Sequence, residues 1–111
     1  MYDFTGKVVV VTGGARGIGR CICEEFQREG AKVCPIDRAD NPYYVGDLAD
    51  RSVLERFAAK VIGDYGGVDC LINNAPPPSL GIGEAGYEDF SRALAIGVTA
   101  PFYLTKLFLP H

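Results

Sequence analysis

Four consecutive valines, Val8–Val11, are the feature that most limits how this chain can fold. A strand with β-branched residues on both faces needs cover on both sides, which is typical of a strand inside a parallel sheet. Gly13, Gly17 and Gly19 follow in the spacing G-x-x-x-G-x-G and lead into a helical pattern. Bare backbone at a helix N-terminus attracts anions, because the helix dipole places partial positive charge there. The stretch therefore predicts a strand, a tight turn and a helix that bind a phosphate or pyrophosphate.

The rest of the chain predicts an alternation of strands and helices. Strands are expected at 7–12, 32–36, 43–46 and 68–73, and helices at 20–29, 51–65 and 87–109. Asp50 is expected to cap the second helix, and Pro101 is expected to bend the third. This order predicts a Rossmann-type α/β fold, a doubly wound parallel sheet of about four strands in the order 3-2-1-4.

Apolar side chains recur at helical spacing in the first and the last of these helices. In the first helix, four residues at this spacing are expected to face the sheet: Ile18, Ile22, Cys23 and Phe26. In the last, the apolar positions include Phe90, Leu94, Val98, Phe102 and Leu109.

Length and composition limit the class of protein further. A chain of 111 residues has room for one compact domain, taken as residues 1–111. An apolar content of 48% and a charged content of 23% indicate a folded protein. The net charge of −3 argues against nucleic acid as a partner, and no apolar run is long enough to span a membrane. The start lacks a signal-peptide pattern, and the four cysteines form neither a C-x-x-C pair nor a zinc spacing, so we expect a cytoplasmic protein without a metal site.

An acidic residue at the end of the second expected strand refines the phosphate prediction. Asp37 lies 18 residues after Gly19, where a carboxylate can accept both hydroxyls of an adenosine ribose. The same carboxylate repels a 2′-phosphate, which favours NAD over NADP as the cofactor. Arg16 and Arg38 leave NADP open, since either guanidinium could neutralise a 2′-phosphate. The alternative is that Asp37 is an ordinary turn residue.

Two further polar positions follow expected strands. Asp47 comes after the third strand, within reach of an adenine amino group, although a turn residue at a helix entry is nearly as good an interpretation. Asn73 and Asn74 end the fourth strand, where side-chain amides can bridge backbone groups of neighbouring strands or simply form a turn.

Taken together, these motifs resemble the short-chain dehydrogenase/reductase family. The similarity rests on four segments: 12–19, Asp37, 46–48 and 73–75, and it continues through 100–102 to 109–111. The resemblance implies a Rossmann fold that binds NAD(H) or NADP(H). It also implies a set of cofactor-binding residues: Gly13, Arg16, Gly17, Ile18, Gly19, Asp37, Asp47, Leu48, Asn74 and Ala75.

Within that set, the resemblance implies a role for each part. Gly13, Gly17, Ile18 and Gly19 hold the pyrophosphate. Asp37 binds the adenosine ribose and Asp47 the adenine, while Asn74–Ala75 lie near the second ribose. No catalytic residue is assigned in this chain.

The chain also departs from the family pattern. Pro76 stands where the family has glycine, and Gly97 stands where it has the catalytic asparagine. None of the four lysines has a tyrosine four residues before it, so the family's Tyr-x-x-x-Lys pair is absent, as is its catalytic serine. We therefore expect the cofactor-binding part of an NAD-dependent oxidoreductase, incomplete relative to the family and inactive alone. The alternative is a non-catalytic dinucleotide-binding or interaction module.

The same resemblance implies an uncovered surface. In the family the fourth strand is flanked by a fifth, and the last helix pairs across a subunit interface. Residues 70–72 are therefore expected on an open sheet edge with apolar side chains partly uncovered, which favours self-association or pairing with a C-terminal half.

Overall fold

A four-stranded parallel sheet forms the centre of the protein in the computed structural model, which describes residues 3–76 and 80–111. Its strands are β1 (Val8–Thr12), β2 (Lys32–Asp37), β3 (Tyr44–Val45) and β4 (Cys70–Asn73). Their spatial order is β3-β2-β1-β4, and each neighbouring pair is parallel. The strand order and the parallel pairing predicted from the sequence are confirmed, and β4 lies at an open edge.

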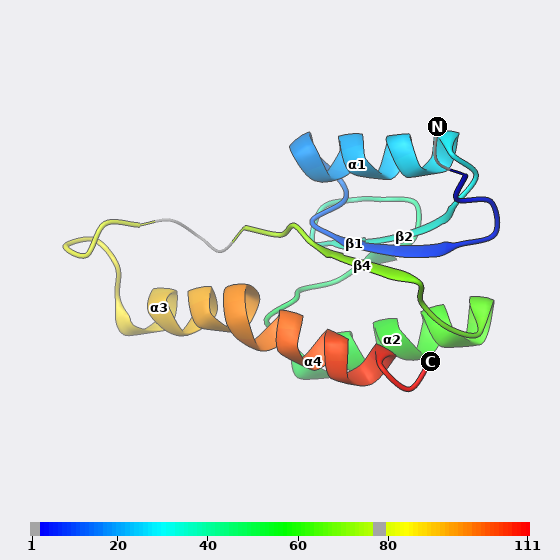
Figure 1. The fold of residues 1–111 in the computed structure, drawn as a ribbon. Helices are drawn as coiled ribbons and strands as arrows, with labels where there is room; N and C mark the ends of the chain where they lie inside the picture. Colours follow the sequence, from blue (N-terminus) through cyan, green and yellow to red (C-terminus); the bar gives the residue numbers. More distant parts are fainter. Residues whose placement is uncertain (1–2, 77–79) are drawn as a thin grey trace.

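Helices cover both faces of this sheet (Figure 1). They are α1 (Gly17–Arg28), α2 (Arg51–Tyr65), α3 (Tyr87–Leu94) and α4 (Ala100–Phe108). Figure 1 shows α1 on one face, α2 and α4 on the other, and α3 projecting beyond the sheet. Among the described residues, no helix is both long and apolar enough to cross a membrane.

The valine run packs as its sequence predicts. Val8 and Val10 join the cluster formed with α2 and α4, whereas Val9 and Val11 join the cluster beneath α1. All four side chains are buried, because successive residues of a strand point to opposite faces and both faces are covered. This run sets the position of β1 and therefore of the glycine turn that follows it.

Helix α1 begins at Gly17, three residues before the expected start at Arg20. Ile22 and Phe26 pack against the cluster beneath α1, and Cys23 is buried, as predicted. The expectation that Ile18 faces the sheet is wrong, since this side chain is 74% exposed. Ile18 belongs to the first turn of α1, beside the glycine turn, before the helix passes over the strands.

The last helical segment is not one bent helix. A π-helical turn, Ala95–Thr99, separates α3 from α4, and Pro101 is only the second residue of α4. Proline has no N–H and cannot donate to the carbonyl of Gly97 four residues earlier. The Ala100 N–H donates to the Ala95 carbonyl, five residues back, as in a π-helix. The irregularity therefore precedes the proline instead of being centred on it.

This segment buries a different stripe from the positions named in the sequence. Its inward residues recur every four positions and are Ile96, Ala100, Leu104 and Phe108. The apolar residues named from the sequence are instead exposed: Phe90, Leu94, Val98, Phe102 and Leu109. We call the first four of these the outer stripe of α3 and α4.

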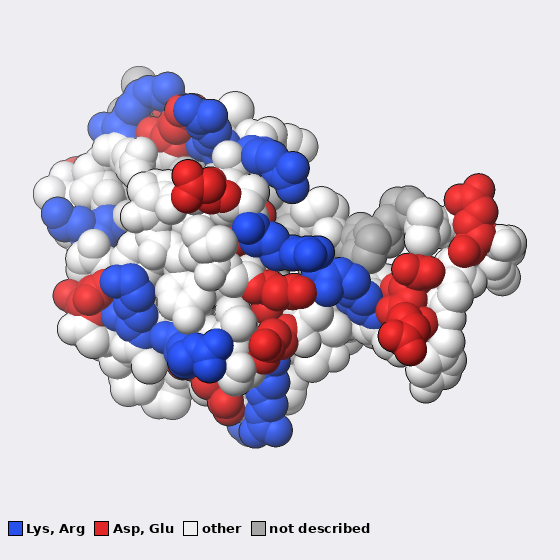
Figure 2. Space-filling view, turned by 180° about the vertical axis from the view of Figure 1, so that it is seen from behind, with Lys and Arg blue, Asp and Glu red and all other residues white. Residues whose placement is uncertain are grey.

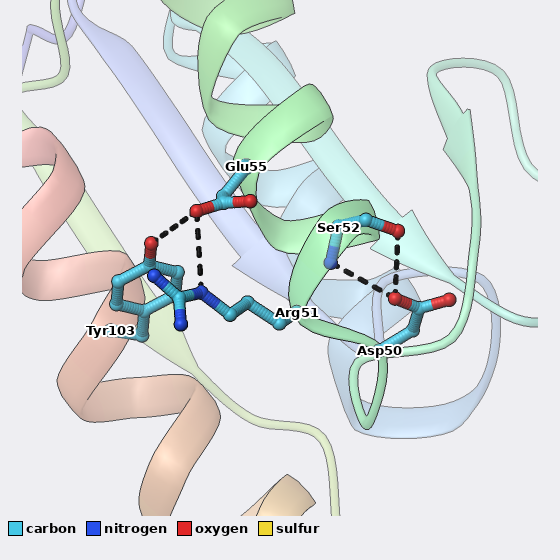
Figure 3. A network of polar contacts seen from close by, with 5 residues as sticks. All are labelled: Asp50, Arg51, Ser52, Glu55 and Tyr103. Carbon is cyan, nitrogen blue, oxygen red and sulfur yellow. Dashed lines mark hydrogen bonds and ion pairs between the residues drawn. The ribbon is translucent and has the colours of Figure 1, made fainter.

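Polar contacts attach α4 to α2 (Figure 3). The Tyr103 hydroxyl donates to Glu55 Oε2, and the Arg51 guanidinium lies 5.2 Å from the centre of the Tyr103 ring. At the start of α2, Asp50 accepts the Ser52 N–H at 2.9 Å, which confirms the predicted cap. These contacts and the shared core place α2 and α4 as one layer beneath the sheet.

Candidate cofactor-binding site

The glycine turn lies between β1 and α1. Gly13 and Gly17 have φ of +70° and +55°, in the left-handed region that favours glycine. The Gly13 N–H donates to the Ile36 carbonyl at 2.8 Å, which holds the turn against β2. Gly17 is the first residue of α1, and a Cβ built on it has no heavy atom within 4 Å. The N-terminus of α1 therefore opens onto free space beside bare backbone.

Gly19, in the first turn of α1, packs directly against the backbone of the glycine turn. A Cβ at this position would lie 2.0 Å from the Gly13 carbonyl oxygen, so no side chain fits without moving the turn. Gly17 thus leaves the helix start accessible, while Gly19 lets the turn fold tightly against it. The accessible start of α1, with the unpaired N–H groups of a first helical turn, fits a pyrophosphate, which is the anion that the sequence predicts.

The ends of β1 and β4 are joined by polar contacts. Thr12 Oγ1 accepts the N–H groups of Asn74 at 3.0 Å and Ala75 at 3.1 Å. Asn74 Nδ2 donates to the Gly13 carbonyl at 3.3 Å, so its side chain bridges to the neighbouring strand end, one of the two interpretations of this residue. The sequence reasoning did not assign a role to Thr12. Its signal was a hydroxyl residue at the end of an otherwise apolar strand, where the structure buries it.

Asp37 ends β2 and contacts the glycine turn. Its Oδ2 accepts the Ala15 N–H at 3.1 Å, and its Oδ1 accepts the Ala39 N–H at 3.0 Å. A carboxylate offers about four lone-pair positions, so both oxygens can accept a further bond. Asp37 therefore combines a fixed orientation with free acceptor capacity next to the turn.

Asp47 follows β3 and forms an ion pair that the sequence analysis did not foresee. Arg92 of α3 donates to both carboxylate oxygens, at 2.9 Å and 3.0 Å. This bonding lowers the pKa of Asp47 below its ordinary value, and the positive charge of Arg38 contributes to the same direction. Asp47 and Arg92 are 45 residues apart, so no local pattern in the sequence could have paired them.

The remaining predicted residues differ in exposure. Arg16 occupies the N-cap position of α1, but its side chain makes no hydrogen bond to the helix. Arg16 is exposed, like Ile18. Leu48 is 7% exposed and belongs to the core on the α2 side. A cavity of about 330 Å³ lies beside it, lined also by Thr12, Asn73, Ala75, Ile96, Gly97, Ala100 and Pro101. This cavity joins the ends of β1 and β4 to the π-helical turn.

The predicted residues share one edge of the sheet. Gly13 follows β1, Asp37 ends β2, Asp47 follows β3, and Asn74 follows β4. In open parallel sheets, ligands bind outside the carboxyl ends of the strands, where these residues lie. The strand order and the glycine turn define the class of Rossmann-type, nucleotide-binding α/β proteins.

The family within that class follows from comparison with known proteins. The family profile described as "short chain dehydrogenase" matches residues 7–111. The chain belongs to this family.

Relatives of known name and structure agree with this assignment. L-fucose dehydrogenase of Mus musculus is 34% identical over 97% of this chain and 45% of its own length. The ligand-free aldohexose dehydrogenase of Thermoplasma acidophilum superposes with a TM-score of 0.86 at 29% identity, over 96% of this chain and 44% of that one. A metagenomic short-chain oxidoreductase in complex with NADP gives a TM-score of 0.89 at 26% identity, over 96% and 56%. The chain thus spans about half the length of the relatives it matches.

Proposed function

We propose that the chain is the cofactor-binding part of an NAD-dependent oxidoreductase, which transfers a hydride between an alcohol and a carbonyl compound. Residues 1–111 form a single Rossmann domain in this proposal, incomplete relative to the family. The observation that carries it is the glycine turn, in which open backbone at the start of α1 lies beside the carboxylate of Asp37. When bound, the nicotinamide cofactor supplies the hydride chemistry.

The chain's own residues orient that cofactor. The N–H groups of the first turn of α1 face the pyrophosphate, since those of Gly13 and Ala15 already donate to Ile36 and Asp37. The exposed side chain of Ile18 borders it. The free acceptor positions of Asp37 receive the ribose hydroxyls, and Asp47 receives the adenine amino group. Asn74 and Ala75 lie near the second ribose, held by Thr12 at the end of β1.

NAD is the proposed cofactor, with NADP as the less favoured choice. The carboxylate of Asp37 would lie close to a 2′-phosphate and repel it. Arg16 and Arg38 are both exposed and could lessen this repulsion, and the similar structures include complexes with NADP and with NADPH. The balance between these charges sets the preference.

A second candidate is a dinucleotide-binding or interaction module without chemistry. The catalytic serine and the Tyr-x-x-x-Lys pair of the family have no counterpart in the 111 residues, so we propose that this chain alone is inactive. Pro76 and Gly97 favour the module further, since both depart from the family pattern inside the segment that is present. An alcohol-oxidation assay of the chain mixed with a separately made C-terminal half distinguishes the oxidoreductase from the module. The cofactor-binding part of an oxidoreductase gains activity in the mixture, whereas a module binds NAD without gaining activity.

A binding experiment tests the role of Asp37. Asp37→Ala should weaken NAD binding and narrow the preference for NAD over NADP about tenfold, since the variant loses two acceptor positions and a charge that repels phosphate. Asp40→Ala is the matched control, because it removes the same charge from an exposed side chain three residues away. Dissociation constants measured by isothermal titration calorimetry give the ratio. An unchanged ratio in Asp37→Ala would refute the assigned role.

Exposed apolar surface supports a partner for this chain. The outer stripe of α3 and α4 faces outward, and β4 at the sheet edge carries partly exposed Cys70, Leu71 and Ile72. We propose self-association or pairing with a C-terminal half. Sedimentation of the chain alone at several concentrations detects self-association, and sedimentation of a mixture with the C-terminal half detects pairing. All four cysteines lie within the described residues and are free thiols, which supports the proposed cytoplasmic location.

A further inference from the structure

The ion pair between Asp47 and Arg92 connects two distant parts of the chain. Arg92 Nη1 lies 2.9 Å from Asp47 Oδ2, and Arg92 Nη2 lies 3.0 Å from Asp47 Oδ1. Two parallel bonds of this kind fix the plane and direction of the carboxylate as well as its charge. Both side chains are partly buried, with exposed fractions of 35% for Asp47 and 30% for Arg92.

Helix α3 has few other attachments to the body of the protein. None of its eight residues is buried, and Figure 1 shows the helix projecting beyond the sheet. Among the described residues, Arg92 is the only α3 side chain that hydrogen-bonds to another helix or loop of the body. Figure 2 shows basic and acidic side chains side by side where the projecting segment joins the body. The pair therefore fixes Asp47 and tethers α3 at the same time.

The bonds to Asp47 leave little acceptor capacity. Its Oδ1 accepts the Ala49 N–H at 2.9 Å in addition to Arg92 Nη2, while its Oδ2 accepts Arg92 Nη1. A carboxylate has about four lone-pair positions, two on each oxygen. Within the described chain, one position on Oδ2 is left for a ligand.

We propose that Arg92 is a positioning residue for the adenine end of the cofactor, acting through Asp47. It orients the carboxylate so that the remaining position on Oδ2 accepts one N–H of the adenine amino group. The inference rests on the proposed function and adds a specificity to it. A purine with a 6-amino group supplies the donor, whereas a 6-oxo purine places an oxygen against the carboxylate and is rejected. The lowered pKa of Asp47 is consistent with this, since the carboxylate stays an acceptor over a wider pH range.

Two dinucleotides that differ in this one group test the proposal. Dissociation constants for NAD and nicotinamide hypoxanthine dinucleotide are measured by calorimetry on the wild type, Arg92→Met, Asp47→Asn and the double variant. Arg92→Met should weaken NAD binding about threefold to tenfold and change hypoxanthine dinucleotide binding much less, as expected for one misaligned charged hydrogen bond. In the Asp47→Asn background, Arg92→Met should change the ratio of the two constants no further. Arg92→Lys, which keeps the charge without the fork, should give an intermediate ratio.

A charge exchange tests whether the tether between Asp47 and Arg92 is enough for NAD binding. The variant Asp47→Arg with Arg92→Asp can re-form the ion pair, and urea unfolding shows whether stability returns. Positioning predicts that NAD affinity stays low in this variant, because a guanidinium now faces the adenine. Recovery of NAD affinity would mean that NAD binding needs the tether alone and neither the Asp47 carboxylate nor its orientation, which would overturn the inference.

The remaining outcomes separate the role of Arg92 from the proposed function. A wild-type protein that binds NAD, with an Arg92→Met variant of unchanged preference for NAD, would overturn the role of Arg92 alone. A wild-type protein that binds neither dinucleotide would overturn the proposed function and this inference together.

Discussion

Replacing Gly19 with alanine should destabilise the protein, whereas the same replacement at Gly63 should stabilise it. Both glycines lie in helices, Gly19 in α1 and Gly63 in α2. Alanine is favoured over glycine inside helices by up to about 1 kcal/mol. A Cβ at Gly63 has no heavy atom within 4 Å, so the helical preference acts alone there. At Gly19 the Cβ would lie 2.0 Å from the Gly13 carbonyl oxygen and 2.5 Å from Asn74 Nδ2.

The size of the loss at Gly19 follows from that overlap. Real Cβ atoms essentially never lie within 3.0 Å of such neighbours, so the backbone of the turn must move. Overpacking of this kind costs about 1–3 kcal/mol, and the movement also weakens the Asn74–Gly13 hydrogen bond, a contact of about 1 kcal/mol. After the helical preference is subtracted, the free energy of unfolding should fall by about 1–3 kcal/mol.

Urea unfolding followed by far-ultraviolet circular dichroism measures both variants. The dependence on urea should stay equal to that of the wild type, so that the midpoint reports native-state stability. Gly63→Ala should raise the midpoint and Gly19→Ala should lower it. Equal upward shifts in both variants would refute the close packing of Gly19 against the turn.

Two further predictions concern the polar contacts of the site. Thr12→Val should lower the free energy of unfolding by about 1–3 kcal/mol, because it removes the acceptor of the Asn74 and Ala75 N–H groups, whereas Thr12→Ser should keep most of the stability in the same urea assay. Arg92→Met should cost about 1 kcal/mol or less near neutral pH. Since Arg92 lowers the pKa of Asp47 in the folded state, the pair stabilises the fold fully above the unfolded pKa of about 3.9 and loses that effect as pH falls through the lowered folded pKa. The stability difference between Arg92→Met and the wild type should therefore disappear in acid, and a difference that persists there would contradict the ion pair.

The fold was predictable where the residues of a short stretch determine its structure by themselves. The valine run at 8–11 requires cover on both faces, and the structure buries it between α1 and the α2–α4 layer. Helix α2 occupies 51–65 as predicted, because Asp50 supplies a cap and Gly66 adopts the left-handed conformation that ends it. Ile18 fits the helical spacing of α1 but is exposed. Periodicity predicts which residues lie on the same face of a helix, but it does not predict how far the sheet extends beneath that face.

The last helical segment shows a different limit of sequence patterns. Two apolar stripes run along it, one with Ile96 and Leu104 and one with Leu94 and Phe102, and both have the four-residue spacing of a helix. Only the packing against α2 decides that the first is buried and the second is exposed. Pro101 predicts an irregularity because it has no N–H to donate. The irregular turn, Ala95–Thr99, lies before the proline, where the carbonyl that this N–H would have bonded is located.

The sequence predicts which carboxylates lie at the site but not how many hydrogen bonds each can still accept. Strand ends in a parallel sheet share an edge, so Asp37 and Asp47 could be assigned to that edge from their positions alone. Their remaining acceptor capacity depends instead on what already bonds to them in three dimensions. Asp37 keeps free positions on both oxygens beside two backbone bonds, while Arg92 and Ala49 leave Asp47 only one. Two carboxylates that read alike in the sequence therefore differ in how many groups of a ligand they can accept, and only Asp37 can accept both hydroxyls of a ribose.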